Sequence, residues 1–181
     1  ELQLLQREEQ LVAEPLCANQ RGDNHHRQCL HNDLIEAKKL QQSLIRERHK
    51  EFATAELSLM LRSSGHVGGD LVGFYPAGEN RLGLFAIDVS GHGISSALMT
   101  ARLAGYLSSE TPEQNLALGR DHDGQTMPLP PAQVIENMNN LVLNEMETEH
   151  YFTLLLADVD LLSGRVLIGQ AGHPHPLLQR I

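Results

Sequence analysis

A short turn between two strand-like runs places two acidic residues opposite each other in this chain. Residues 67–75 and 81–89 are mostly apolar, and the turn-forming residues 76–80 separate them. If the turn centres near Gly78, antiparallel partners have residue numbers that sum to roughly 157 or 158. Asp70 and Asp88 satisfy that sum, so the sequence predicts that their carboxylates face each other across one ladder.

Two facing carboxylates repel each other, and something must offset the repulsion. Their Cβ atoms would lie about 4.5–5.5 Å apart, and like charges at that distance destabilise a strand pair. The offset could be a shared proton, a cationic side chain or a bound divalent metal. The nearest Arg or Lys residues, Arg62 and Arg81, lie well along the strands, while glycines leave the backbone open at 68–69 and 91–93. The sequence therefore favours a metal.

Composition excludes several classes of function. A net charge of −9 with only 14 Lys and Arg in 181 residues disfavours a nucleic-acid binder. The sequence contains no run of about 18 apolar residues, so it predicts no membrane-spanning helix. Cys17 and Cys29 have no second Cys-x-x-Cys partner, so we expect free thiols and a cytoplasmic protein. The chain does not begin with Met, and we expect it to be a piece of a longer protein.

Residues 1–49 differ from the rest, because they are polar and carry apolar side chains at helical spacing. Two readings are open: an amphipathic helix that lies on the domain, or a coiled-coil connector that dimerises and transmits a signal from an upstream module. The expected seam is interrupted at Pro15 and at residues 22–24, and Gln41 occupies a seam position. Its second half consists of Leu30, Leu34, Ala37 and Leu44.

Residues 50–181 alternate between strand and helix patterns. We expect strands at 57–62, 151–161, 165–172 and from 176 onward, helices at 94–109 and 130–147, and a mobile loop at 112–129. Together with the hairpin, this order predicts an α+β fold, a β-sandwich flanked by helices that cover a sheet face.

Three segments together resemble a known family. They are Val67-Gly68-Gly69-Asp70, then Ile87-Asp88-Val89-Ser90-Gly91-His92-Gly93 with Ser95-Ser96-Ala97-Leu98-Met99, and Tyr151-Phe152-Thr153 leading to Ala171-Gly172-His173-Pro174-His175-Pro176. Their order and spacing resemble the SpoIIE-type, protein phosphatase 2C-like (PPM) serine/threonine phosphatases of bacterial signalling, especially those fused to response-regulator receivers. The resemblance covers roughly residues 40 to 181.

The resemblance implies a binuclear Mn²⁺ or Mg²⁺ centre at which water attacks a phosphoserine directly. It implies that Asp70, Asp88 and the backbone carbonyl of Val89 bind metal. Hard oxygen ligands of this kind suit either ion. His92 is a candidate proton donor to the leaving serine oxygen, but a histidine between two glycines equally serves to hold a loop.

The chain also departs from the family pattern. Gly73 stands where members often carry a second acidic residue, and the family's last acidic motifs would follow Ile181. The chain is therefore either part of an active enzyme, in which the C-terminal part of the fold is missing, or an inactive relative. The remaining candidates receive structural interpretations. We expect His173 and His175 to shape a tight connection between strands, and Asp158 and Asp160 to lie on a solvated strand face. Ser90 is not expected to be a nucleophile, because its surroundings do not form a strand-to-helix elbow.

We therefore expect a metal-dependent phosphoserine/phosphothreonine hydrolase at 50–181, joined through the connector at 1–49 to a receiver or sensor. By resemblance, its substrate is a phosphorylated anti-sigma-factor antagonist or a similar regulatory protein, and we expect a homodimer. The alternative is a non-catalytic adaptor that keeps the fold and binds a signalling partner. A pure adaptor has no physical need for opposed carboxylates. The sequence does not decide between Mn²⁺ and Mg²⁺, nor name the upstream signal.

Overall fold

The computed structural model describes residues 19–45, 47–63, 65–108, 112–120, 122 and 124–179. The chain divides into two compact units, residues 1–36 and 37–181, and each is described by itself. In the first unit, all described residues belong to helix α2, which begins at Asn19 and ends at Ser43 in the second unit. No helix among the described residues is long and apolar enough to cross a bilayer.

Helix α2 corrects two details of the expected connector. It is continuous through Gly22, so the predicted interruption at 22–24 is wrong. A single glycine inside a helix costs only about 1 kcal/mol relative to alanine, which a 25-residue helix tolerates. Pro15 lies outside the described residues. Residues 37–49, assigned to the connector from the sequence, fall in the second unit with the rest of the fold.

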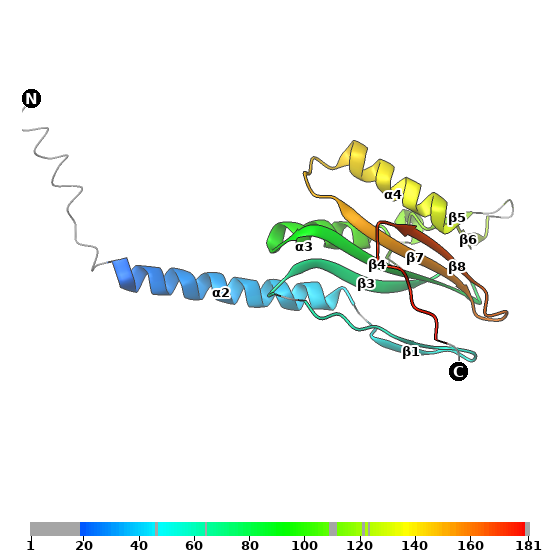
Figure 1. Ribbon diagram of the computed structural model, residues 1–181, viewed down its shortest axis with the longest axis horizontal. Helices are drawn as coiled ribbons and strands as arrows, with labels where there is room; N and C mark the ends of the chain where they lie inside the picture. Colours follow the sequence, from blue (N-terminus) through cyan, green and yellow to red (C-terminus); the bar gives the residue numbers. More distant parts are fainter. Residues whose placement is uncertain are drawn as a thin grey trace, which may run out of the picture. The chain divides into compact units, whose positions relative to one another are not determined.

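The second unit is built on a four-stranded antiparallel sheet in the order β3-β4-β7-β8 (Figure 1). Its strands are β3 (Gly68–Pro76), β4 (Arg81–His92), β7 (Phe152–Asp160) and β8 (Val166–Ala171). Both predicted hairpins are confirmed, and β3 and β8 are the edge strands of this sheet.

Helices α3 (Ile94–Gly105) and α4 (Pro131–Glu145) cover one face of the sheet (Figure 1). Helix α4 begins with Pro131, as the sequence predicted, and α3 ends four residues before the expected Ser109. The buried core between helices and sheet includes Leu71, Ile87, Leu103, Val134, Met138, Leu154 and Leu156. The mixed α+β fold expected from the sequence is confirmed.

Two glycines make room for aromatic rings on this buried face. Gly73 is paired with Phe85, and a Cβ at Gly73 would lie 2.3 Å from the ring. Gly83 is paired with Tyr75 in the same way, at 2.1 Å. The two rings stack with centroids 6.5 Å apart. Gly73, which departs from the family pattern, therefore has a packing role here, since any side chain would displace Phe85.

Two small antiparallel sheets accompany the four-stranded sheet. Strands β1 (His49–Glu51) and β2 (Glu56–Ser58) form the first, and β5 (Leu118–Arg120) and β6 (Thr126–Pro128) form the second, preceded by a 3₁₀ turn at Pro112–Gln114.

Three sequence expectations outside the four-stranded sheet are wrong. The strand predicted at 57–62 ends at Ser58, because Leu59 and Leu61 pack on the core from an irregular segment. The predicted mobile loop at 112–129 holds the β5–β6 hairpin, anchored by the buried Asn115, which bonds Ser108 O at 3.1 Å and Ala117 N at 2.8 Å. Within the described residues 176–179 no strand follows β8.

One end of the sheet contains a buried ion pair. Asp158, expected on a solvated face, is 8% exposed and accepts two hydrogen bonds from Arg81, one of them at 3.1 Å from Nε. Asp158 stands opposite Gly83 in the ladder, so its side chain lies on the covered face. Burial, followed by the nearby Asp158, raises the pKa of the Tyr75 hydroxyl. The arginine neutralises a carboxylate that the fold has buried.

Candidate metal centre

The β3–β4 ladder brings the two predicted carboxylates together. Asp70 and Asp88 are Cα partners, as the turn position predicted, and the register of the ladder shifts between Gly68 and Asp70. Paired residues of an antiparallel ladder point to the same face, with Cβ atoms about 4.5–5.5 Å apart. Both side chains are exposed to solvent, so ions can reach them.

The charges of this pair have no Lys or Arg partner in the described part of the chain. Among the described residues, no Lys or Arg forms an ion pair with Asp70 or Asp88. Partial burial and then the charge of Asp88 raise the pKa of Asp70, while His173 lowers it. A raised pKa means that the ionised form of Asp70 is disfavoured in the folded chain. A bound cation would reverse that effect.

A third strand extends the row of polar side chains. Thr153 of β7 is the Cα partner of Asp88, so it lies on the same face. Its Oγ1 is 2.8 Å from Nδ1 of His173, and His173 is half-buried. The interpretation of His173 as only a shaper of the connection is therefore incomplete. Sequence reasoning did not assign Thr153, because the pairing of residues 88 and 153 is not local.

A glycine allows the backbones of β3 and β4 to approach closely beside the pair. A Cβ at Gly69 would lie 2.1 Å from the carbonyl oxygen of Val89, so no other residue fits there. The Val89 side chain is buried at 1% exposure, which holds its backbone in place. The structure thus places the Val89 carbonyl beside Gly69, the residue before Asp70.

His92 lies at the exposed end of β4, as the Cα partner of Gly68. It is four residues from Asp88 along the strand, or about 13 Å at the usual rise of a strand. The end of β4 and the start of α3 are tied to the segment before β7: Ser90 N donates to Tyr151 O at 2.8 Å, and the Ser95 hydroxyl is 3.0 Å from Nε2 of His150. The Ser90 hydroxyl accepts a bond from Tyr151 N at 3.1 Å, which is a structural use.

The donor atoms present fit part of a divalent-metal site. Two exposed carboxylates and a nearby carbonyl are the hard oxygen ligands that Mg²⁺ and Mn²⁺ prefer. No group of three or more His, Cys, Asp or Glu side chains gathers within the described part of the chain. The residues are thus suited to hold a metal but supply only part of a binuclear ligand set.

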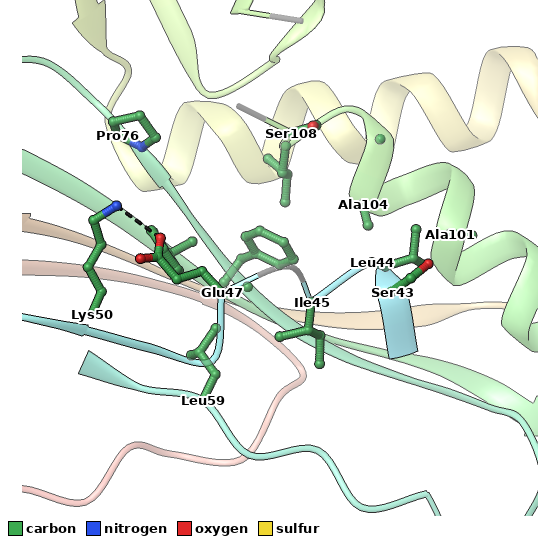
Figure 2. A pocket seen from close by; sticks show the side chains of 15 residues that line it. Ser43, Leu44, Ile45, Glu47, Lys50, Leu59, Pro76, Ala101, Ala104 and Ser108 are labelled. Atoms are coloured by element: carbon green, nitrogen blue, oxygen red, sulfur yellow. Dashed lines mark hydrogen bonds and ion pairs between the residues drawn. The ribbon is translucent and has the colours of Figure 1, made fainter. Parts of the chain in front are cut away.

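A cavity elsewhere in this unit has no part in that site. It measures about 470 Å³ and lies between residues 43–50, β3 and α3 (Figure 2). Its walls combine apolar and polar side chains, and Glu47 forms an ion pair with Lys50 at 2.9 Å at one side (Figure 2). Neither Asp70 nor Asp88 lines it.

Comparison with known proteins points to one family. The family described as "Stage II sporulation protein E (SpoIIE)" matches residues 78–181, which include Asp88, Val89 and His92. A curated relative, "Phosphoserine phosphatase RsbP" of Bacillus subtilis (strain 168), is 32% identical over 121 residues. That match covers 65% of this chain and 27% of RsbP, so the chain spans about a quarter of the relative's length.

Proposed function

This chain belongs to the SpoIIE family, and we propose that it is the catalytic part of a metal-dependent serine/threonine protein phosphatase of bacterial signalling. The observation that carries the proposal is the pair of facing, exposed carboxylates, Asp70 and Asp88, with no Lys or Arg paired to them among the described residues. Similarity to a phosphoserine phosphatase supports the same reaction class.

We propose Mn²⁺ or Mg²⁺ as the cofactor, held by Asp70, Asp88 and the carbonyl of Val89. When bound as a pair, such ions activate water for attack on phosphorus and neutralise the phosphoryl oxygens. The two aspartates contribute the negative charge that retains the ions. Thr153 fixes the ring of His173 at the edge of this row through its hydroxyl.

His92 remains our candidate for the proton donor to the leaving serine oxygen, and the loop-holding role remains its alternative. Substrates that differ in their leaving group separate the two roles. A serine alkoxide needs a proton to leave, whereas p-nitrophenolate does not. If His92 donates that proton, His92→Gln slows hydrolysis of a phosphoserine peptide far more than hydrolysis of p-nitrophenyl phosphate. Equal slowing of both would indicate the loop-holding role.

For the substrate, we propose a phosphorylated regulatory protein similar to an anti-sigma-factor antagonist, dephosphorylated in the cytoplasm. The alternative is a non-catalytic adaptor that binds such a partner. The exposed carboxylate pair favours the enzyme, because a surface used only for docking gains nothing from unrelieved repulsion between like charges.

The test is hydrolysis of a phosphoserine protein by the full-length protein that contains this chain. We expect turnover only with added Mn²⁺ or Mg²⁺, and a loss of about a hundredfold or more in Asp88→Asn, because a metal ligand is removed. Asp160→Asn is the control, because it neutralises an acidic residue at the opposite end of the sheet, and it should retain turnover. Hydrolysis that survives chelation, or an Asp88→Asn variant with full turnover, would contradict the proposal.

We further propose that residues 1–36 of the expected connector dimerise and link the unit at 37–181 to a receiver or sensor. Leu30, at a seam position of α2, is 51% exposed, as a side chain that pairs with a second helix requires. Light scattering on the chain with and without residues 1–36 tests the dimer. Monomers in both cases at high micromolar concentration would contradict it.

A further inference from the structure

The buried side chain of Gln41 binds the backbone of Gly68, two residues before the candidate metal ligand Asp70. Gln41 is 6% exposed in the last turn of α2. Its Nε2 donates to the carbonyl oxygen of Gly68 at 2.5 Å, and its Oε1 accepts from the N–H of Gly68 at 3.2 Å. Gly68 is the first residue of β3, an edge strand of the four-stranded sheet. The carboxamide therefore takes the place of a neighbouring strand at this one residue.

A second side chain holds the next residue from the other side. The hydroxyl of Thr100, buried in α3, lies 2.6 Å from the carbonyl oxygen of Gly69 and 2.8 Å from that of Ser96. Gly69 itself lies against the Val89 backbone, with no room for a Cβ. Two glycines have wide backbone freedom and no side chains with which to anchor themselves. Gln41 and Thr100 supply the anchors that they lack.

We propose that Gln41 is a positioning residue for metal binding: by holding Gly68, it keeps Asp70 opposite Asp88 and so couples the end of α2 to metal affinity. This inference rests on the proposed function. The pairing register with β4 shifts between Gly68 and Asp70, so the position of Gly68 bears on the register at which Asp70 enters the ladder. Side chains that orient ligands from outside the metal shell typically change metal affinity by about 10–100-fold.

A purely structural role for Gln41 predicts a different outcome. The segment after α2 is also anchored by Ile45, which is 5% exposed and belongs to the hydrophobic core. Ile45→Ala should therefore lower stability through a cavity while leaving both bonds to Gly68 in place. Gln41→Met keeps the length of the side chain and removes both bonds. The two variants separate loss of packing from loss of positioning.

The experiment is calorimetric titration of Mn²⁺ into the full chain and its variants, well below their melting temperatures. We expect Gln41→Met to bind Mn²⁺ about tenfold more weakly than the wild type. Gln42→Met, at an exposed neighbour on the same helix, and Ile45→Ala should bind within about twofold, the usual size of an uncoupled effect. Unchanged affinity in Gln41→Met, or equal weakening in Ile45→Ala, would overturn the inference.

Amide hydrogen exchange without metal gives a readout that does not depend on the proposed function. Exchange at Asp70 should accelerate in Gln41→Met and stay near the wild-type rate in Gln42→Met. If Gln41→Met does not fold, Gln41→Glu retains the acceptor for the Gly68 N–H and should show the same acceleration to a smaller degree. A wild-type chain that binds no Mn²⁺ contradicts the metal centre, while unchanged exchange at Asp70 contradicts the positioning role of Gln41.

Discussion

The acidic residues at the two ends of the four-stranded sheet have opposite environments. At one end, Asp158 is buried on the helix-covered face and paired with Arg81 through two hydrogen bonds. At the other end, Asp70 and Asp88 are exposed and face each other, and no Lys or Arg in the described part of the chain pairs with them.

The comparison shows which carboxylates serve the fold and which serve a ligand. The fold can supply an arginine where it buries a carboxylate, because an unpaired buried charge is strongly destabilising. It leaves Asp70 and Asp88 without one, although facing like charges cost free energy. We therefore assign Asp158 to stability and the facing pair to binding of a cation.

The largest expected effect comes from removing the arginine at the structural end. Arg81→Met leaves Asp158 buried without its partner, and the free energy of unfolding should fall by about 3 kcal/mol, the lower part of the range for buried pairs. The lower part applies because the Arg81 side chain is 43% exposed. Urea unfolding followed by circular dichroism measures the loss. Lys50→Met is the comparison, because it breaks only the exposed ion pair with Glu47. If Arg81→Met lowers the free energy of unfolding no more than Lys50→Met does, the assignment of Asp158 to stability is contradicted.

A smaller effect of opposite sign is expected at the binding end. Without metal, Asp88→Asn removes one of two repelling charges, so the free energy of unfolding should stay level or rise by about 0.5 kcal/mol. The same urea experiment in the presence of a chelator measures it. A decrease of more than about 1 kcal/mol, a typical cost of losing a structural contact, would mean that Asp88 supports the fold.

The smallest effect is a difference in pH dependence. Partial burial, then Asp88, raises the pKa of Asp70, so its stabilising contribution is complete below its ordinary value of 3.8 and is lost as pH rises through the raised pKa. Without metal, Asp70→Asn should therefore gain stability relative to the wild type as pH rises from about 3.5 to 6. Urea midpoints across this range test the sign.

Asp160 is the control for that sign. A hydrogen bond from the backbone N–H of Ser163 is the largest cause of its lowered pKa. Burial opposes that effect, and hydrogen bonds from the Leu162 N–H and the Ser163 hydroxyl and the charge of Arg81 add to it. Its stabilising contribution is present above 3.8 and is lost as pH falls through the lowered pKa. Asp160→Asn should therefore lose stability relative to the wild type as pH rises. The same sign in both variants would contradict the assigned environments.

Local pairings were predictable from the sequence. The Asp70–Asp88 register follows from a short turn, which fixes the partners of both adjoining strands. The Pro131 start of α4 likewise depends on local geometry. The sequence thus specified the central hairpin, the α+β class and the two facing carboxylates.

Contacts between distant segments were not predictable in this way. Gln41 and Gly68 are 27 residues apart, and Arg81 and Asp158 are 77 apart. Helical spacing placed Gln41 on a seam that either a second helix or the domain itself could cover, and its carboxamide is buried against β3. Alternation placed Asp158 on a solvated face, because the pattern of one strand does not reveal which face the helices cover. Hydrophobic periodicity reports burial and not the identity of the partner.

The most direct test of the central claim is thermal unfolding of the chain with and without millimolar Mn²⁺. Because a ligand that binds only the folded state stabilises it, about 1 kcal/mol of binding should raise Tm by about 2–4 °C. We predict this rise for the wild type and for Asp160→Asn, and its loss in the double variant Asp70→Asn/Asp88→Asn. An equal rise in the double variant would show that Mn²⁺ binds elsewhere and would contradict the assignment of the facing carboxylates.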